Sequence, residues 1–540
     1  MSNVKTITNQ TSDDNKVTAA QYCYLLYFAV MFFAKAIGLY DGQLLYNISI
    51  VVGMTLFGLK VLMSRHSIFE LCWMSVLLIC GFMVVLNTDQ RGFLFYMTLV
   101  AGIKDVPEKK VFKTALLILG FAYPVMAFLT LSGIVSEYYR LHHKIGMYII
   151  CHGLGYPHPN VTHITYLILT MLILYFVRNR SAVQMLKISI FLMLGNVIVF
   201  GYTFSFTGAI AVTVYLIINF CLTSIPKARK LWGVLSQMVL PICLAFALIG
   251  PLVIKGHLFD IINKALNTRF YLSKYFLTMQ PATFFGMRFL PEELENYNYT
   301  MDCSYVYGLR QLGVIPFVIL ILFLLYTIYS LNKKGRNVEL AIMLGICVAG
   351  VTEPFMFNSS YRNMAFVLIG MQIFELSDKI SKKLPSFWNK EIHIIKAGDI
   401  VVNSNALLVD RVAGYCEDII KRITESKVRF GILFAIMCIA SIIGYYVAVQ
   451  HPTTMYVNYD INEEADWPET MLTLEDVAEL EEKGEIILDY TGEGTPMYAY
   501  DGLTPIIEYN RRALAVGLYT GALGVVLVSL GTARFRSKRK

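Results

Sequence analysis

The sequence predicts an all-α polytopic membrane protein with about 14 transmembrane helices. Hydrophobic residues make up 56% of its 540 residues and charged residues only 16%, and the mean hydropathy is +0.56. Apolar stretches of bilayer-spanning or nearly spanning length follow one another along most of the chain. Basic residues gather in every second connecting segment, which is the pattern of cytoplasmic loops.

The apolar stretches form a core block of twelve and a C-terminal pair. They lie at about 21–38, 43–62, 67–86, 91–103, 112–134, 160–177, 183–200, 206–224, 232–253, 305–331, 338–356, 361–376, 430–448 and 513–532. The stretch at 91–103 is short for a span. The polar N-terminal segment shows no small-residue cleavage site after the first stretch, so we expect this stretch to remain as an anchor.

A cytoplasmic N-terminus would place only basic segments on the inner side. These are KVLMSRH, KDVPEKKVFK, RNRSAVQMLK, PKARK, NKKGRN, DKISKK and the tail ARFRSKRK. Adding or removing one span would move half of them outside, against the preference of Lys and Arg for the cytoplasm. We therefore expect both termini in the cytoplasm. The net charge of +8 arises from these cytoplasmic segments and does not indicate a nucleic-acid partner.

The chain divides into three predicted parts. Residues 1–376 form the polytopic core, with a large external loop at 254–303 between the ninth and tenth helices. Residues 377–429 form a cytoplasmic linker with the apolar spacing of an amphipathic helix. Residues 430–540 form a two-helix extension with an external acidic module at 451–511.

The acidic module has 15 Asp or Glu and one Lys between 451 and 510. TLEDVAELEEKG predicts a short helix capped by Thr473 and ended by Gly484, and EIILDY predicts a strand. A small α+β module is therefore one interpretation. A disordered, solvated linker is the other, because the segment is so acidic.

The loop before the sixth predicted helix is rich in histidine. Five of the nine histidines lie between positions 142 and 163, and Arg140 begins the same segment. In CHGLGYPHPN, residues 151–160, we expect Asn160 to cap the next helix, whose first N–H groups suit a phosphate. His152 and His158 flank this turn. An ordinary helix start with interfacial histidines is the alternative.

The large external loop contains a second set of candidates. Residues 257–277 predict one interfacial helix, with Arg269 on it and Arg288 beyond it at the level of lipid headgroups. Nonselective binding of anionic phospholipid explains these cations equally well.

A third set lies where the chain re-enters the membrane. The segments TMDCSYVYGLRQLGVIPF and VTEPFMFNSSYRN contain Asp302, Ser304, Tyr305, Arg310, Glu353 and Arg362. Ionisable residues at membrane depth are costly and mark functional sites. Structural ion pairing between helices is the alternative, above all for Glu353.

Two cysteines, Cys151 and Cys303, fall in predicted external loops. A disulfide would join these loops in an oxidising exterior, and two free thiols are the alternative. The sequence contains no nucleotide-binding glycine loop, no HExxH or CxxC pattern and no spaced pair of external aspartates. We therefore expect no ATP-driven transport, no metal and no other cofactor.

In their order along the chain, several short motifs resemble the Wzy-type polysaccharide polymerases of capsule, exopolysaccharide and O-antigen synthesis, which are related to the O-antigen ligases. The motifs are HGLGYPHPN, GYTFSFTG, ALNTRFYL, FFG, DCSYVYGLRQLGVIPF and VTEPFMFN, within about residues 20–376. The chain departs from the family pattern at Phe206, where relatives have arginine, at Cys303, where they have asparagine, and in its acidic extension.

The resemblance implies a metal-independent glycosyltransferase at the external face of a bacterial cytoplasmic membrane. It would join oligosaccharide repeat units that are carried on polyprenyl diphosphate. The characteristic family positions are Arg140, His158, Asn160, Arg269, Asp302, Ser304, Tyr305 and Glu353.

Of the candidate residues, we expect four to act in catalysis. Arg140 and Arg269, assisted by Arg288, would stabilise the leaving diphosphate. Asp302, or else His158, would be the general base. The residues expected to bind substrate are His152, Asn160, Arg288, Ser304, Tyr305, Arg310, Glu353 and Arg362.

Two other functions stay open. An enzyme like the O-antigen ligases would transfer a finished glycan to another acceptor, and a flippase or exporter would move glycan without chemistry. Polar clusters at the outer face, and few charges within the spans, favour surface chemistry. The expected partners are the lipid-linked oligosaccharide and membrane lipid, and the extension is a candidate binding site for a chain-length regulator or a flippase.

Overall fold

The computed structural model describes residues 16–144, 147–225, 229–290, 293–296, 299–358, 360, 362–403, 408–452, 454–458, 482, 486–490, 496–501 and 503–537. These residues form two compact units, which are described separately. The first unit draws on the ranges 1–123, 163–198 and 206–404, and the second on 124–162, 199–205 and 405–540. The predicted parts 1–376, 377–429 and 430–540 stay predictions, because this division reflects packing alone.

The first unit is built from helices of varied length. They are α1 (Ala19–Ala36), α2 (Leu44–Met63), α3 (Ile68–Thr88), α4 (Gly92–Gly102), α8 (Phe206–Ser224), α9 (Arg229–Leu244), the π-helix η2 (Ala245–Ile249), α10 (Gly250–Val253), α11 (His257–Ala265), α12 (Arg269–Met279), α13 (Ser304–Tyr307), the π-helix η4 (Gly308–Leu312), α14 (Val314–Lys333), α15 (Asn337–Ala349), η5 (Pro354–Met356), α16 (Ala365–Ser381), η6 (Ser386–Asn389) and η7 (Lys396–Asp399). Two short antiparallel pairs join β1 (Lys16–Thr18) to β6 (Val401–Asn403) and β2 (His66–Ser67) to β5 (Glu391–Ile392). Three helices, α5 (Glu108–Leu131), α6 (Pro159–Phe176) and α7 (Ala182–Thr203), have residues in both units.

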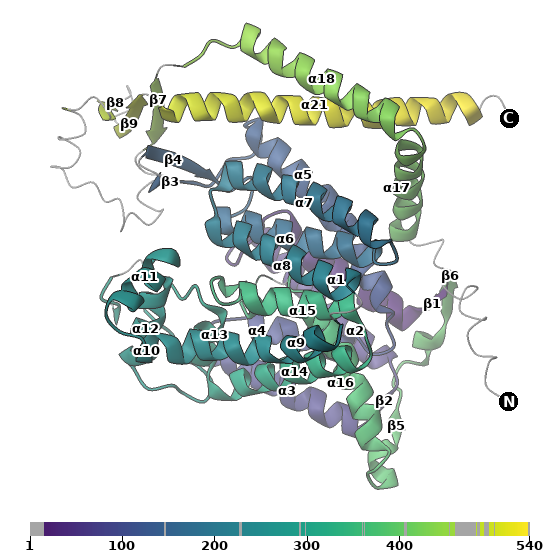
Figure 1. Cartoon of the computed structure of the whole chain (residues 1–540). Helices are drawn as coiled ribbons and strands as arrows, with labels where there is room; N and C mark the ends of the chain where they lie inside the picture. The colour runs from purple at the N-terminus through teal and green to yellow at the C-terminus, as the bar shows by residue number, and fades with distance from the viewer. Residues whose placement is uncertain are drawn as a thin grey trace. The chain divides into compact units, whose positions relative to one another are not determined.

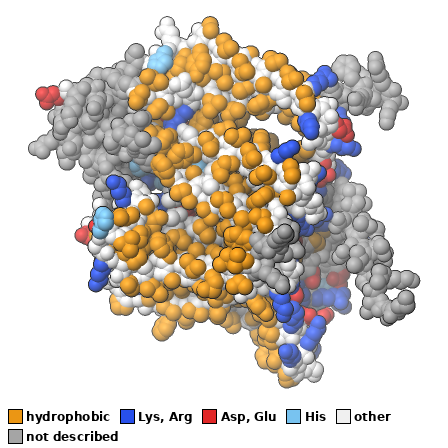
Figure 2. All heavy atoms as spheres, viewed as in Figure 1, with side chains coloured by type: hydrophobic (Ala, Val, Ile, Leu, Met, Phe, Trp, Pro, Cys, Tyr) orange, Lys and Arg blue, Asp and Glu red, His pale blue; other side chains and the backbone are white. Residues whose placement is uncertain are grey.

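Within the described residues, 11 helices are long and apolar enough to cross a membrane. They are α1, α2, α3, α5, α6, α7, α8, the stretch Leu231–Val253, α14, α18 and α21. On the face shown in Figure 2, hydrophobic side chains cover the helices and charged side chains gather toward the edges. The prediction of an all-α polytopic membrane protein is thus confirmed, whereas the count of 14 spans stays a prediction.

Two of the predicted spans are short and deeply buried helices. α4 has 11 residues and α15 has 13, so at 1.5 Å per residue they rise only about 17 and 20 Å. Nearly every residue of both helices is buried. A helix that is apolar all round lies inside a bundle, and these two helices accordingly form the interior of the first unit.

The segment 257–277, which the sequence predicts to be external, is not the single helix that its apolar spacing predicts. α11 ends at Ala265 and α12 begins at Arg269. Between them, Asn267 and Thr268 have φ values of 50° and 63°, the left-handed region in which a right-handed helix cannot continue. The break makes Arg269 the first residue of α12 and buries its side chain, which the sequence prediction had placed among lipid headgroups.

The second unit is centred on a C-terminal helix pair. α17 (Leu408–Glu425) is the predicted amphipathic helix, and it leads into α18 (Lys427–Ala448), which lies side by side with α21 (Leu503–Ser537) in Figure 1. β7 (Thr454–Asn458), β9 (Pro496–Asp501) and β8 (Ile486–Tyr490) form an antiparallel sheet in that order. β8 confirms the predicted strand, and the helix predicted at 473–484 lies, apart from residue 482, outside the described residues.

The second unit also contains the histidine-rich loop. Its residues form a hairpin of β3 (Tyr139–Lys144) and β4 (Met147–His152). α6 begins at Pro159, and the His158 Nδ1 atom accepts a hydrogen bond of 3.0 Å from the backbone N–H of Asn160. His158 is therefore the cap and Asn160 lies in the first turn, because proline is favoured as the first residue of a helix.

We expect glycines on α21 to be required for its packing against α18. A Cβ on Gly521 would lie 2.9 Å from the Phe434 ring, whereas one on Gly531 would meet nothing within 4 Å. Gly521→Leu should therefore overpack the helix pair, at a cost of about 1–3 kcal/mol, and lower the thermal unfolding midpoint in detergent. Gly531→Leu is the matched control on the same helix. Equal midpoints for the two variants would contradict this packing.

Candidate functional site

Three ionisable residues from distant parts of the sequence meet in the first unit. Arg269 Nε lies 3.2 Å from Asp302 Oδ2, and Arg269 Nη2 lies 3.5 Å from Glu353 Oε1. The side chains of Arg269 and Glu353 are buried, whereas that of Asp302 is 29% exposed. We call these residues the arginine–carboxylate cluster, and Asp302 is its accessible member.

Glu353 is held in place from two sides. The Thr207 hydroxyl at the start of α8 donates a hydrogen bond of 2.6 Å to Glu353 Oε1. The hydroxyl of Ser304, which is fully buried, donates to the Glu353 backbone oxygen over 2.5 Å. Thr207 was not among the predicted site residues, although it belongs to the SFTG motif in which the family's arginine is missing. Its contact with Glu353 gives that motif a role in the cluster.

The cluster contains more negative than positive charge when all three groups are ionised. Glu353 lies in the turn after α15, outside the helical spans. Burial raises the pKa of Glu353 to about 7, with Asp302 adding to this effect and Arg269 and the Thr207 hydrogen bond opposing it. Glu353 therefore changes its protonation near neutral pH, and the net charge beside Arg269 changes with it.

An apolar groove lies in the same unit as the cluster. It has a volume of about 410 Å³ and runs between α9 with η2 on one side and α14 on the other, and every side chain lining it is apolar. η2 packs against α12 and α13, and the Phe246 and Phe270 rings lie 5.5 Å apart between their centroids. η2 thus contributes both to the groove and to the packing of α12, the helix that begins at Arg269.

The remaining predicted residues of the first unit do not join the cluster. Arg288 is exposed and pairs with Asp89 at the end of α3. The Tyr305 hydroxyl donates to the Cys347 backbone oxygen over 2.7 Å, and Arg362 donates to the Thr165 hydroxyl. Arg310 is buried in η4, where its Nη2 lies 4.0 Å from Met287 Sδ.

The predicted residues before α6 belong to the second unit. The Arg140 guanidinium donates to the Tyr138 hydroxyl over 3.3 Å. His152 lies in a buried ion network, with Nδ1 2.9 Å from Glu137 Oε2 and Nε2 2.8 Å from Glu508 Oε2. Both ring nitrogens of His152 are therefore occupied within the protein, and contact with a substrate would require one of these bonds to break. Its predicted role in substrate binding stays untested.

Cys151 and Cys303 are buried free thiols in this structure. They are therefore unpaired cysteines, which was the alternative to a disulfide. The Cys151 thiol contacts the Ile149 backbone oxygen, and the Cys303 thiol contacts that of Gly350.

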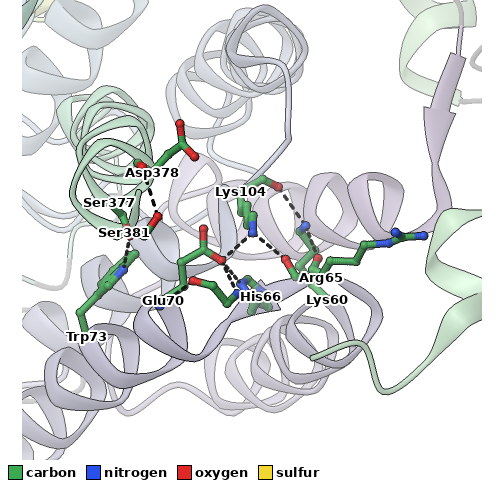
Figure 3. A network of polar contacts seen from close by, with 11 residues as sticks. Lys60, Arg65, His66, Glu70, Trp73, Lys104, Ser377, Asp378 and Ser381 are labelled. Atoms are coloured by element: carbon green, nitrogen blue, oxygen red, sulfur yellow. Dashed lines mark hydrogen bonds and ion pairs between the residues drawn. The ribbon is translucent and has the colours of Figure 1, made fainter. Parts of the chain in front are cut away.

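A second polar network lies at the other end of α3, away from Asp89 (Figure 3). Lys104 Nζ lies 2.5 Å from Glu70 Oε2 and donates to the Arg65 backbone oxygen over 2.6 Å. Lys60 Nζ donates to Ser64 and to the Lys104 backbone oxygen, over 2.5 and 3.0 Å. The sequence prediction treated these basic residues only as a topology signal. The structure shows that they also connect the loops that follow α2 and α4.

Within the described ranges, no group of three or more His, Cys, Asp or Glu side chains is placed to hold a metal ion. Comparisons of the chain with protein-family models, with curated proteins and with solved structures found no match. The resemblance to polysaccharide polymerases therefore stays a prediction that rests on the motifs quoted above.

The His152 network predicts a pH-dependent stability. Burial disfavours the charged ring, but hydrogen bonds and charges from Glu137 and Glu508 outweigh this effect and raise the pKa of His152 to about 9. A raised histidine pKa contributes stability that is complete below about pH 6.5, the unfolded value, and is lost as the pH rises through about 9. Arg511 on α21 and Tyr202 on α7 also face this network.

We therefore expect the thermal unfolding midpoint in detergent to fall between pH 6.5 and 9. His152→Gln should lower the midpoint at pH 6.5 and remove most of this dependence. His257→Gln, which changes an exposed histidine on α11, is the control and should behave like the unaltered chain. A His152→Gln variant with an unchanged pH profile would contradict the role given to this network.

Proposed function

We propose that the protein polymerises oligosaccharide repeat units carried on polyprenyl diphosphate, at the outer face of a bacterial cytoplasmic membrane. The observation that carries this proposal is the arginine–carboxylate cluster, which lies in the same unit as an apolar groove. A substrate with a long hydrocarbon tail and an anionic diphosphate combines the two properties that such a site suits. The motif order that resembles the Wzy-type polymerases supports the same substrate class.

The proposed reaction is a glycosyl transfer without a metal. A hydroxyl of the incoming repeat unit attacks the anomeric carbon of the growing chain, and the bond from that carbon to the diphosphate oxygen breaks. Asp302 accepts the hydroxyl proton, because it is the exposed carboxylate of the cluster. Arg269 stabilises the negative charge that the departing lipid diphosphate gains.

The charge of the cluster limits how Arg269 can act. With both carboxylates ionised, one guanidinium faces two negative groups, and the net negative charge repels a diphosphate. Protonation of Glu353 makes the cluster neutral and removes one of the two carboxylate charges that compete with the anion for Arg269. Glu353 thus regulates anion binding, and its direct contact with substrate is not required.

Arg269→Ala should reduce polymer formation by at least about 100-fold, as the loss of one transition-state charge partner commonly does. The assay is gel analysis of carrier-linked glycans in the native host, comparing the intact gene, its deletion, Arg269→Ala and Arg269→Lys. Lys264→Ala removes an exposed cation from neighbouring α11 and is the control. The amount of each variant in the membrane separates loss of activity from loss of fold.

The glycan that accumulates distinguishes the candidate functions. Single repeat units on the outer leaflet, in both the deletion and Arg269→Ala strains, are expected for a polymerase. Full-length polymer that stays on its carrier would indicate a ligase. Units trapped on the cytoplasmic side would instead indicate a flippase or exporter, and would overturn the proposal.

The Glu353 pKa of about 7 predicts the pH dependence of substrate binding. As the pH rises through about 7, Glu353 loses its proton, and the KM for the lipid-linked donor should increase. Glu353→Gln retains a side chain that can bond Thr207 and should give a KM that changes little between pH 6 and 8. A donor KM that responds to pH equally in both proteins would exclude Glu353 as the titrating group.

A further inference from the structure

Glu508 and Arg511 of α21 form a bridge between the C-terminal extension and the β3–β4 hairpin. Glu508 bonds His152 at the end of β4, and Arg511 Nη1 donates to the Ile150 backbone oxygen on the same strand over 2.7 Å. Arg511 also pairs with Glu508 one helical turn away. The side chains of His152, Glu508 and Arg511 are all buried.

The charges of this bridge balance within the second unit. Protonated His152 and Arg511 supply two positive charges, and Glu137 and Glu508 supply two negative charges. Removing one partner would leave a buried charge without compensation, which is costly in a low-dielectric interior. The four residues therefore hold one another in a single arrangement.

The hairpin needs such support. A two-stranded hairpin is marginally stable by itself. The loop that follows β4 contributes Leu154 to a buried apolar cluster, whose other members are Ala127 of α5, Tyr202 of α7 and Ala515 of α21. In the register of the hairpin, Arg140 pairs with Cys151, the neighbour of His152. A shift of His152 would therefore shift the strand position of Arg140.

We propose that α21 is a positioning element, whose Glu508 and Arg511 fix the hairpin that carries Arg140. Neither residue touches the substrate in this proposal, and both act through the hairpin. The inference rests on the proposed function, because the resemblance that supports that function implies that Arg140 binds the lipid diphosphate. It gives a role to the extension, the part of the chain that lies outside the resemblance to the polymerases.

The test combines a readout of hairpin position with one of catalysis. Cys151 lies on β4 and is buried, so its reaction with a membrane-impermeant maleimide, followed by mass spectrometry of its peptide, reports whether the hairpin opens. Steady-state kinetics with the polyprenyl-diphosphate-linked repeat unit report KM and kcat. Both are measured on the full chain in lipid nanodiscs.

Glu508→Ala and Arg511→Ala should each increase the Cys151 labelling rate at least about tenfold. They should raise the donor KM by a similar factor and change kcat less, because the residues proposed for the chemical step, Asp302 and Arg269, are unaltered. Glu508→Gln retains a hydrogen-bond acceptor for His152 and should show intermediate values, which keeps the test informative where the alanine variants do not fold. Arg512→Ala, at the exposed neighbouring position, should change neither value.

Unchanged Cys151 labelling in Glu508→Ala, Arg511→Ala and Glu508→Gln would overturn the positioning role. Faster labelling with an unchanged donor KM would also overturn it, since the hairpin would then open without consequence for substrate. If the intact chain makes no polymer while labelling rises in Glu508→Ala, the proposed function fails and the structural bridge stands. The two failures are thus distinguishable.

Discussion

Arg269 is a buried cation, and the part of the first unit around it is arranged to supply counter-charges. An arginine keeps its charge in a protein, so Asp302 and Glu353 must approach it from separate segments of the chain. Ser304 and Thr207 then fix Glu353. The requirement to neutralise one guanidinium thereby brings the starts of α8, α12 and α13 to the turn that follows α15.

The same principle organises the second unit, with a different outcome. There the positive and negative groups balance, both histidine nitrogens are occupied, and the result is a rigid connection between a hairpin and a helix. In the first unit the balance is incomplete, because two carboxylates face one arginine and one of them titrates near neutral pH. An unbalanced cluster can accept a ligand or a proton, whereas a balanced one serves to hold structure.

Much of the helical framework follows from the sequence, because apolar length is a local property. The region of every predicted span contains a helix. The sequence motifs also point to Arg269, Asp302, Ser304 and Glu353, which lie together in the structure. The break at Asn267 and Thr268 was not predicted. Asparagine enters the left-handed region more readily than most residues, but it also occurs within helices, and threonine rarely enters that region. Glu508 and Arg511 were missed because they precede the predicted span 513–532. Their spacing of three residues, with opposite charges beside an apolar run, was the available signal.

The shortness of α15 has a consequence for the depth at which its ends lie. A helix that rises about 20 Å is roughly 10 Å shorter than the hydrocarbon core of a bilayer, so a membrane around it places at least one of its ends below the lipid headgroups. The backbone beyond that end must be kept from hydrocarbon by surrounding protein. Bilayer thickness then determines how far that end lies from water, and lipids of different chain length would alter its dielectric environment without changing any residue.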